Sequence, residues 1–205
     1  MNNIKIRKAI LEDADSFVKI KNHLPMNLSE EKTSKGGFLL GTTVEEYKFY
    51  IETSLVLVVE DDNKVIGFGI ILLDHIIRES SLWKKREEVT WFIDFKRYEN
   101  IELSYFEQLA FLPGYKYWPT RLAYQILKES FDNGAKALIT TTVKKPVKNM
   151  AALPLIEIAH GVLAGNINET HPSVGEINSD IYIIDSENFY KYVPIHPLFK
   201  LLFEK

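Results

Sequence analysis

The chain has 205 residues, and its 25 Lys and Arg nearly balance its 28 Asp and Glu, which gives a net charge of -3. Such a balance produces no field that would recruit nucleic acid or an anionic membrane, so we expect neither partner. The absence of cysteine excludes disulfides, thiolate zinc sites and a cysteine nucleophile, and it is compatible with the reducing cytoplasm, where we expect the protein to lie. The sequence contains no uncharged run of about 18 apolar residues and no signal-peptide pattern at its start.

The N-terminal third predicts a strand, a helix, a loop and a second helix. Residues 4–10 alternate apolar and charged side chains as a strand does, and Ala14, Phe17 and Val18 in the following segment have helical spacing. The polar, glycine-containing residues 24–41 indicate a loop, of the kind that often lines a site. Thr43 and Glu46 have the spacing of a capping box, so a second helix is expected to begin there.

A hairpin and an irregular segment follow. Residues 54–73 are two β-branched and apolar runs around the turn sequence EDDNK, which predicts two adjacent antiparallel strands. Residues 74–102 are charged and aromatic and are interpreted as an insertion. Within them Leu82, Arg86, Val89 and Ile93 have a spacing that predicts a helix.

The C-terminal half alternates strands and helices. Residues 103–113 predict a central strand and residues 120–134 a helix that ends at Asn133 and Gly134. A strand at 135–143, a short helix within 149–161 and a late strand at 179–185 complete the pattern. The amphipathic tail, residues 195–205, is expected to dock either on its own domain or on a second subunit of a homodimer. The fold class is therefore predicted to be α/β (α+β), a mixed sheet with antiparallel N-terminal strands and helices on both faces.

Residues 106–127, FEQLAFLPGYKYWPTRLAYQIL, resemble the central segment of the GCN5-related N-acetyltransferases (GNAT). That segment has a strand ending in Leu-x-x-x-Pro, a Q/R-x-x-G-x-G/A pyrophosphate loop and a long amphipathic helix. Residues 56–72 and 139–161 are similar to the family's hairpin and to its late Asn-containing strand and helix. The resemblance implies one GNAT-like domain over residues 1–205, with the insertion at 74–102. It also implies acetyl transfer from acetyl-CoA to an amine of a small molecule or peptide.

The pyrophosphate loop departs from the family pattern. With Pro113 aligned, Lys116 falls on the Q/R position, Pro119 on the first glycine and Arg121 on the final Gly/Ala. Residues 115–121 contain no glycine, and Pro119 has no N–H to offer a phosphate, although Lys116 and Arg121 supply positive charge. An ordinary packed turn is the alternative interpretation. The cofactor contacts implied by the resemblance are Leu109, Ala110, Phe111, Tyr115, Lys116, Tyr117, Trp118, Thr120, Arg121 and Asn149, and helix capping is the alternative role for Asn149.

Glu107 is the candidate general base. The resemblance places a carboxylate at this position, and strand alternation predicts that it shares a face with Tyr105, Leu109 and Phe111. Apolar neighbours would raise its pKa toward the range useful for a base, whereas a solvated strand residue is the alternative. The family's usual acid, a tyrosine, is replaced by Ile156. His160 could supply the proton chemically, although a packing role near the helix end is favoured for it.

Two hypotheses remain open at this point. The first is an N-acetyltransferase that acts by direct attack, with Glu107 as base and residues 115–121 on the pyrophosphate. The second is a GNAT-like binding module that has lost the coenzyme A chemistry, as the residues at 119, 121 and 156 would allow. No metal site is expected, because the five histidines lack ligand spacing.

Overall fold

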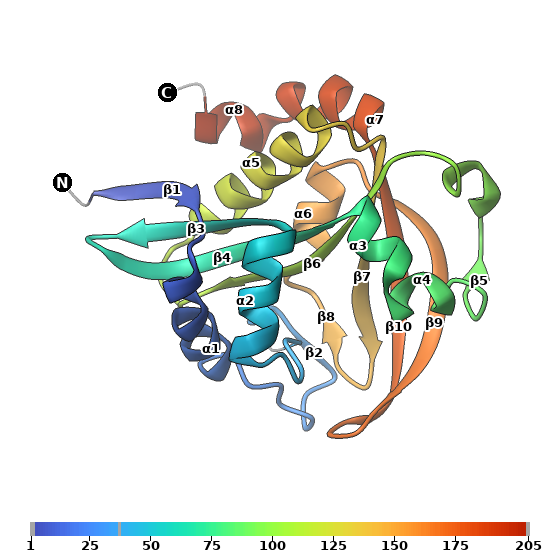
Figure 1. The fold of residues 1–205 in the computed structure, drawn as a ribbon, viewed down its shortest axis with the longest axis horizontal. Coiled ribbons are helices and arrows are strands. Elements are labelled where there is room, and N and C mark those ends of the chain that lie inside the picture. The colour runs from blue at the N-terminus through green and yellow to red at the C-terminus, as the bar shows by residue number, and fades with distance from the viewer. Residues whose placement is uncertain (1–2, 37, 204–205) are drawn as a thin grey trace.

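A sheet of eight strands forms the centre of the computed structural model, which describes residues 3–36 and 38–203 (Figure 1). A parallel pair of two-residue strands, β2 (Lys32–Thr33) and β8 (Lys148–Asn149), lies apart from it. In spatial order the large sheet consists of β1 (Ile4–Lys8), β3 (Leu55–Asp61), β4 (Lys64–Leu73), β6 (Leu103–Phe111), β7 (Ala137–Lys145), β10 (Gly175–Asp185), β9 (Val162–His171) and β5 (Thr90–Trp91).

The sheet is mixed because one neighbouring pair of its strands is parallel. Strands β1, β3, β4 and β6 pair antiparallel, β6 and β7 pair parallel, and β7, β10, β9 and β5 pair antiparallel. The predicted fold class is therefore confirmed. The parallel pair lies at the middle of the sheet, where the chain crosses between its two antiparallel halves.

Helices cover both faces of the sheet and bury two apolar clusters. On one face α1 (Ala14–Asn22), α2 (Val44–Thr53), α3 (Asp74–Glu79) and α4 (Ser81–Lys85) pack with the 3-10 turns η1 (Leu11–Asp13) and η2 (Phe95–Tyr98). On the other face lie α5 (Trp118–Asp132), α6 (Leu153–Ile158), α7 (Ser186–Tyr192), η3 (Val193–Ile195) and α8 (Pro197–Phe203). None of the helices that the structure describes is long and apolar enough to cross a membrane.

Several local sequence signals behave as predicted. The Thr43 side chain accepts a hydrogen bond from the Glu46 N–H (3.2 Å), and the Glu46 carboxylate accepts one from the Thr43 N–H (2.7 Å), so the capping box is present. Asp62 and Asn63 have positive φ angles of 46° and 65°, as a two-residue hairpin turn requires. Gly134 has a φ of 112° just after α5, in agreement with the predicted helix stop.

Two differences concern elements whose positions depend on distant contacts. The helix predicted through Val89 and Ile93 is wrong, because α4 ends at Lys85 and β5 follows. Strand β9 was not predicted, and it pairs along most of β10. The C-terminal tail agrees with the first of its two predicted alternatives, because α8 packs on its own chain: the centroid of the Phe199 ring lies 4.7 Å from that of Tyr124 in α5.

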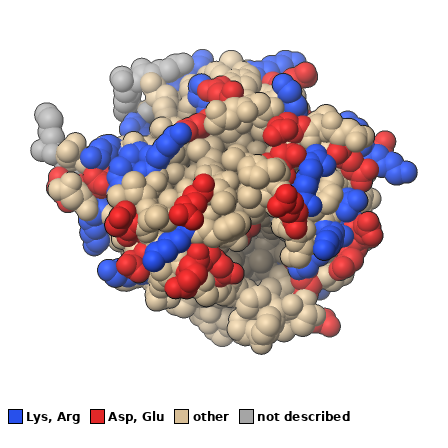
Figure 2. Space-filling model, viewed as in Figure 1, with Lys and Arg blue, Asp and Glu red and all other residues tan. Residues whose placement is uncertain are grey.

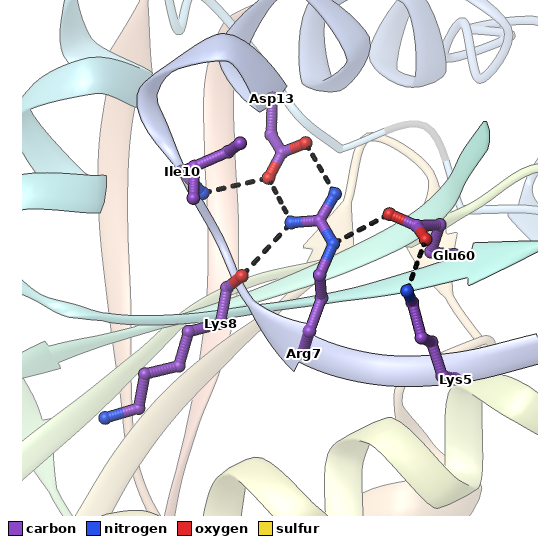
Figure 3. Close-up of polar contacts among 6 residues, drawn as sticks. All are labelled: Lys5, Arg7, Lys8, Ile10, Asp13 and Glu60. Atoms are coloured by element: carbon purple, nitrogen blue, oxygen red, sulfur yellow. Dashed lines mark hydrogen bonds and ion pairs between the residues drawn. The ribbon is translucent and has the colours of Figure 1, made fainter. Parts of the chain in front are cut away.

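A charged cluster fastens the N-terminal strand to the sheet (Figure 3). The Arg7 guanidinium donates to both carboxylate oxygens of Asp13 (2.7 and 3.0 Å) and to one oxygen of Glu60 in β3 (2.7 Å). Both carboxylates are buried, and the Lys5 ammonium lies 3.0 Å from the second Glu60 oxygen. Hydrogen bonds from Arg7 and Lys5 lower the pKa of Glu60, and those to Asp13 and Glu60 raise the pKa of Arg7. Arg7 thereby joins β1, η1 and β3.

We predict that Arg7→Met destabilises the protein, because the buried Asp13 carboxylate then loses two charge-assisted hydrogen bonds. A loss of about 2 kcal/mol is expected, which lowers the unfolding midpoint by roughly 4 to 8 °C in a chain of this size. Lys8→Met is the matched control. The Lys8 side chain is 78% exposed and pairs with Glu129 at 3.4 Å, so its removal should change the midpoint little. Equal midpoints for the two variants in a thermal melt would contradict this role of Arg7.

Candidate active site

Strands β6 and β7 separate halfway along their length. Their parallel pairing runs from Leu103 and Ala137 to Phe106 and Thr140, and the Thr140 hydroxyl donates to the Phe106 carbonyl (3.2 Å). In the described part of both strands no pair joins residues 107–111 to residues 141–145, although each strand continues. The facing backbone N–H and C=O groups beyond Phe106 are therefore available to an extended ligand rich in amides.

Glu107 lies at the point where the strands separate, in a β-bulge. Gln108 pairs with Ile70 and Phe106 pairs with Ile71, so Glu107 is the extra residue that has no partner in β4. The bulge changes the alternation of β6. Tyr105 and Ala110 belong to the apolar cluster under α1 and α2, whereas Leu109 and Phe111 pack against the cluster under α5. The prediction that Tyr105, Leu109 and Phe111 share one face is therefore wrong.

The residue after the bulge is anchored by α2 and the loop before it. Gln108 is buried, its carbonyl oxygen accepts from the Tyr47 hydroxyl (3.0 Å), and its amide donates to the Thr42 hydroxyl (2.9 Å). Tyr47 is fully buried and packs edge-on against Phe17 of α1, with ring centroids 5.4 Å apart. Because these partners fix Gln108, they also fix the backbone position of its neighbour, Glu107.

Burial raises the pKa of Glu107, and the negative charge of Glu46 adds to the rise, while a hydrogen bond from the Gln108 amide offsets part of it. The Glu107 charge in turn contributes to the raised pKa values of Tyr47, Tyr50 and Tyr105, in each of which burial is the largest cause. The carboxylate therefore lies among tyrosines of α2 and β6, in a setting that favours its protonated form.

The separated strands open into a cleft of about 450 Å³. Figure 2 shows this face of the molecule hollowed beside α2, between that helix and the α3–α4 segment. Among the predicted site residues, the lining includes Glu107, Leu109, Ala110, Phe111 and Asn149. Pro119 from the first turn of α5 and residues 34–36, 38 and 39 of the loop before α2 line it too; residue 37 lies outside the described residues. The structure thus brings the predicted base and the predicted backbone contacts together.

The other predicted cofactor residues lie around the turn that leads into α5, outside the cleft lining. The Tyr115 hydroxyl donates to Asp61 (3.1 Å), while Lys116 and Tyr117 are exposed. The Arg121 guanidinium lies over the Trp118 ring, 5.2 Å from its centroid, and near the Phe203 ring of α8. Thr120 lines a separate small pocket between α5 and α8.

The start of α5 has few backbone donors to offer an anion. A helix leaves its first four N–H groups without helical partners, and here the Trp118 N–H is donated to the Tyr115 carbonyl (3.2 Å) while Pro119 has none. Of these four positions, only Tyr117 and Thr120 then have an N–H group to offer an anion. Any phosphate here would therefore depend on side chains, of which Lys116 is the exposed cation.

Three candidate residues lie in or beside α6, and two of them line the cleft. Asn149 lines the cleft, and its side-chain oxygen accepts from the Ala151 N–H (3.0 Å), so it forms a turn and does not cap α6, whose N-cap is Ala152. Ile156 is buried and lines the cleft without a titratable group. His160 is exposed, stacks on Tyr192 at 4.1 Å and lines a different pocket, which supports the packing role.

Tyr105 and Thr141 are the site residues that sequence reasoning did not single out. Both line the cleft, and their hydroxyls form a hydrogen bond of 2.8 Å across the β6–β7 boundary. Tyr105 lies two positions before Glu107. A polar residue so close to the candidate base was the sequence signal that could have identified it as a site residue. No three histidine, aspartate or glutamate side chains gather as a metal site in residues 3–36 and 38–203.

Comparison with solved structures identifies the fold. The chain is similar to an N-acetyltransferase from Staphylococcus aureus Mu50, with a TM-score of 0.58, 16% identity and coverage of 89% of this chain and 98% of that one. A Salmonella typhimurium protein solved with its cofactor acetyl-CoA has a TM-score of 0.59, 16% identity and coverage of 89% and 94%. The ribosomal-protein-S18-alanine N-acetyltransferase from Escherichia coli has a TM-score of 0.59, 12% identity and coverage of 89% and 93%.

No family model and no curated protein sequence matches the chain. The chain has the fold of the GNAT acetyltransferases, so the resemblance predicted from residues 106–127 is confirmed at the level of fold. At these identities the likeness concerns the fold alone, and the activity has to be argued from the cleft.

The environment of Glu107 predicts a pH-dependent change in stability. Its pKa is raised in the folded state, so the proton it binds stabilises the fold below its ordinary pKa, and this stabilisation is lost as the pH rises through the raised value. Glu107→Gln removes the half-buried charge. We expect a higher unfolding midpoint than wild type at neutral pH and a difference that disappears near about pH 4.

Glu102→Gln is the control, because Glu102 is exposed just before β6 and should give no such pattern. Thermal melts of the three proteins across this pH range provide the measurement. A lower midpoint for Glu107→Gln at neutral pH would show instead that a partner stabilises the ionised carboxylate.

Proposed function

We propose that the protein transfers an acetyl group from acetyl-CoA to a primary amine by direct attack. The observation that carries the proposal is the bulge that places the Glu107 carboxylate, with its raised pKa, where β6 and β7 separate. A carboxylate whose pKa is shifted upward is better matched to accepting a proton near neutral pH than an ordinary one. The fold shared with N-acetyltransferases supports the same reaction class.

Glu107 acts as the general base. It takes a proton from the acceptor's ammonium group, which frees the nitrogen lone pair for attack. When bound, acetyl-CoA would supply an acetyl thioester. The amine nitrogen would form a bond to its carbonyl carbon, the carbon–sulfur bond would break, and the proton that the nitrogen loses would go to the sulfur, so that coenzyme A leaves as a thiol. Burial keeps the nearby Tyr105 phenol protonated, since it raises its pKa, so Tyr105 offers the cleft a hydroxyl where Ile156 offers none.

The residues that would hold acetyl-CoA lie on two sides of the cleft. The backbone of Leu109, Ala110 and Phe111 has no strand partner on the β7 side and fits the amides of a pantetheine arm, with Asn149 on the opposite wall. Phosphates at residues 115–121 would meet chiefly the Lys116 ammonium, because the start of α5 has few free N–H groups. The acceptor would enter beside α2 and the loop of residues 24–41.

Two substitutions separate catalysis from cofactor binding. Glu107→Gln should lower kcat by about 10² to 10⁴-fold and leave the Kd for acetyl-CoA nearly unchanged. Lys116→Ala should raise that Kd roughly fivefold, the scale of about 1 kcal/mol for an exposed charge contact, with little change in kcat. Calorimetry gives the Kd, and release of the coenzyme A thiol with a panel of primary amines gives kcat.

Lys136→Ala is the matched control for Lys116→Ala, because Lys136 is an exposed lysine beyond the opposite end of α5. It should leave both constants unchanged. Wild-type turnover in the Glu107 variant would refute the assignment of the base. The non-catalytic alternative predicts that acetyl-CoA does not raise the unfolding midpoint even at millimolar concentration, whereas ligand at 100 times its Kd should raise it by about 5 to 10 °C.

A further inference from the structure

A second cavity, of about 70 Å³, lies between the 74–102 segment and the sheet. Its walls are mostly apolar. The segment contributes the side chains of Trp83, Val89, Trp91 and Phe95, and the sheet contributes those of Ile139, Ile167 and Ile181 from β7, β9 and β10. Protein interiors keep few voids larger than a water molecule, so a cavity of this size between well-packed elements requires an explanation.

The walls of this cavity are tightly packed. Trp91 and Phe95 stack with their ring centroids 3.9 Å apart and their planes within 7°. The guanidinium groups of Arg78 and Arg86 lie 4.6 and 4.7 Å from the Trp83 ring centroid. Such walls do not collapse easily onto the space between them, so the cavity is a preformed feature of the segment and the sheet.

The cavity is a direct neighbour of the cleft. Tyr105 and Thr141 line both, and their hydrogen bond lies at the boundary. Glu107 is two residues along β6 from this boundary. The outer lining includes the Lys85–Glu169 ion pair (2.5 Å), whose side chains are 43% and 31% exposed. If an acceptor amine binds with its nitrogen beside Glu107, the alkyl group on that nitrogen would therefore lie next to this apolar cavity.

We propose that this cavity is the specificity pocket for the acceptor and takes a short branched aliphatic chain, such as an isobutyl or isopentyl group, carried by a primary amine. The inference rests on the proposed function. The walls are mostly apolar, and the Glu169 carboxylate in the lining is already paired with Lys85, so a charged or polyamine chain would lose its hydration there with no unpaired carboxylate to compensate for it. The volume favours a group smaller than an aromatic ring, since a cavity of about 150 Å³ is the size that accepts benzene.

Ile167 offers two opposite changes at one position. It is buried, lies in β9 and lines the cavity but not the cleft. Wild type should acetylate isoamylamine with a kcat/KM at least about 10-fold above that for ethylamine, the scale of one or more buried methylenes. Ile167→Phe fills the pocket and should reduce this preference to less than about 3-fold. Ile167→Ala enlarges it and should raise activity toward phenethylamine. A gain of activity toward the larger amine, phenethylamine, cannot result from poorer folding of the variant.

Leu163→Phe is the control, since Leu163 is exposed on the same strand and lines neither cavity. It should keep the wild-type preference. If amines are acetylated but both Ile167 variants keep the wild-type profile, the pocket is refuted while the proposed function stands.

A second readout needs no turnover. Trp83 and Trp91 line the cavity, so isoamylamine should change the tryptophan fluorescence saturably in wild type and not in Ile167→Phe. This result without any acetyl transfer would support the pocket and count against the proposed function. The absence of a saturable change in wild type overturns the pocket.

Discussion

The end of the parallel pairing between β6 and β7 is the constraint on which the site depends. Up to Phe106 and Thr140 the two strands satisfy each other's backbone groups, and beyond these residues each continues with one free edge. A buried edge is costly unless something pairs with it. The bulge at Glu107 lies at the first unpaired position, so the same irregularity ends the pairing and turns a carboxylate into the cleft.

The helices on the first face keep this irregular strand in place. Gln108 is held by Tyr47 and Thr42, and Tyr47 belongs to a ring cluster in which Phe17 and Phe68 stack at 4.2 Å. Phe68 lies in β4, the strand that pairs with β6. On the opposite face Gly67 makes room for the Phe111 ring, which a Cβ at position 67 would meet at 2.3 Å. Both faces of β4 thus position β6.

The buried carboxylates Asp13 and Glu60 and the half-buried carboxylate Glu107 have different roles in the chain. Asp13 and Glu60 share Arg7, which stabilises their charges, lowers the pKa of Glu60 and fastens β1 to the sheet. Glu107 is surrounded by tyrosines, has an amide as its hydrogen-bond partner, and its pKa is raised. The first arrangement stabilises the fold at neutral pH, whereas the second costs stability there. A destabilising charge kept in a cleft is typical of a residue retained for chemistry.

The parts of the fold that were predictable from sequence are those specified by local signals. The capping box at Thr43, the hairpin turn at Asp62 and Asn63, and the end of α5 at Asn133 and Gly134 each depend on residues within a few positions of one another. Glu107 and the backbone of residues 109–111 could be named as candidates because a motif in one continuous segment carries them, and the structure places them in the lining of one cleft.

The remaining features depend on contacts between distant segments. The alternation of side chains along β6 does not reveal the position of a bulge, because the bulge is defined by the register with β4. Strand β9 contains Gly165 and two asparagines, which are rare in strands, yet a Cβ at Gly165 would meet Val89 at 2.9 Å and Trp91 at 3.1 Å. That glycine is needed because the 74–102 segment packs against the strand. Thr90 and Trp91 of this segment pair with β9, and this distant pairing replaces the helix that the spacing of Val89 and Ile93 predicts.

Hydrogen–deuterium exchange with and without saturating acetyl-CoA tests the central claim most directly. If the separated strands receive the pantetheine arm, amide exchange should slow in residues 107–111 and in the turn at 115–121, while β9 and the outer half of β10 remain unchanged. Unchanged exchange in residues 107–111 at saturating acetyl-CoA, or protection confined to other segments, would contradict the assignment of the β6–β7 cleft as the cofactor site.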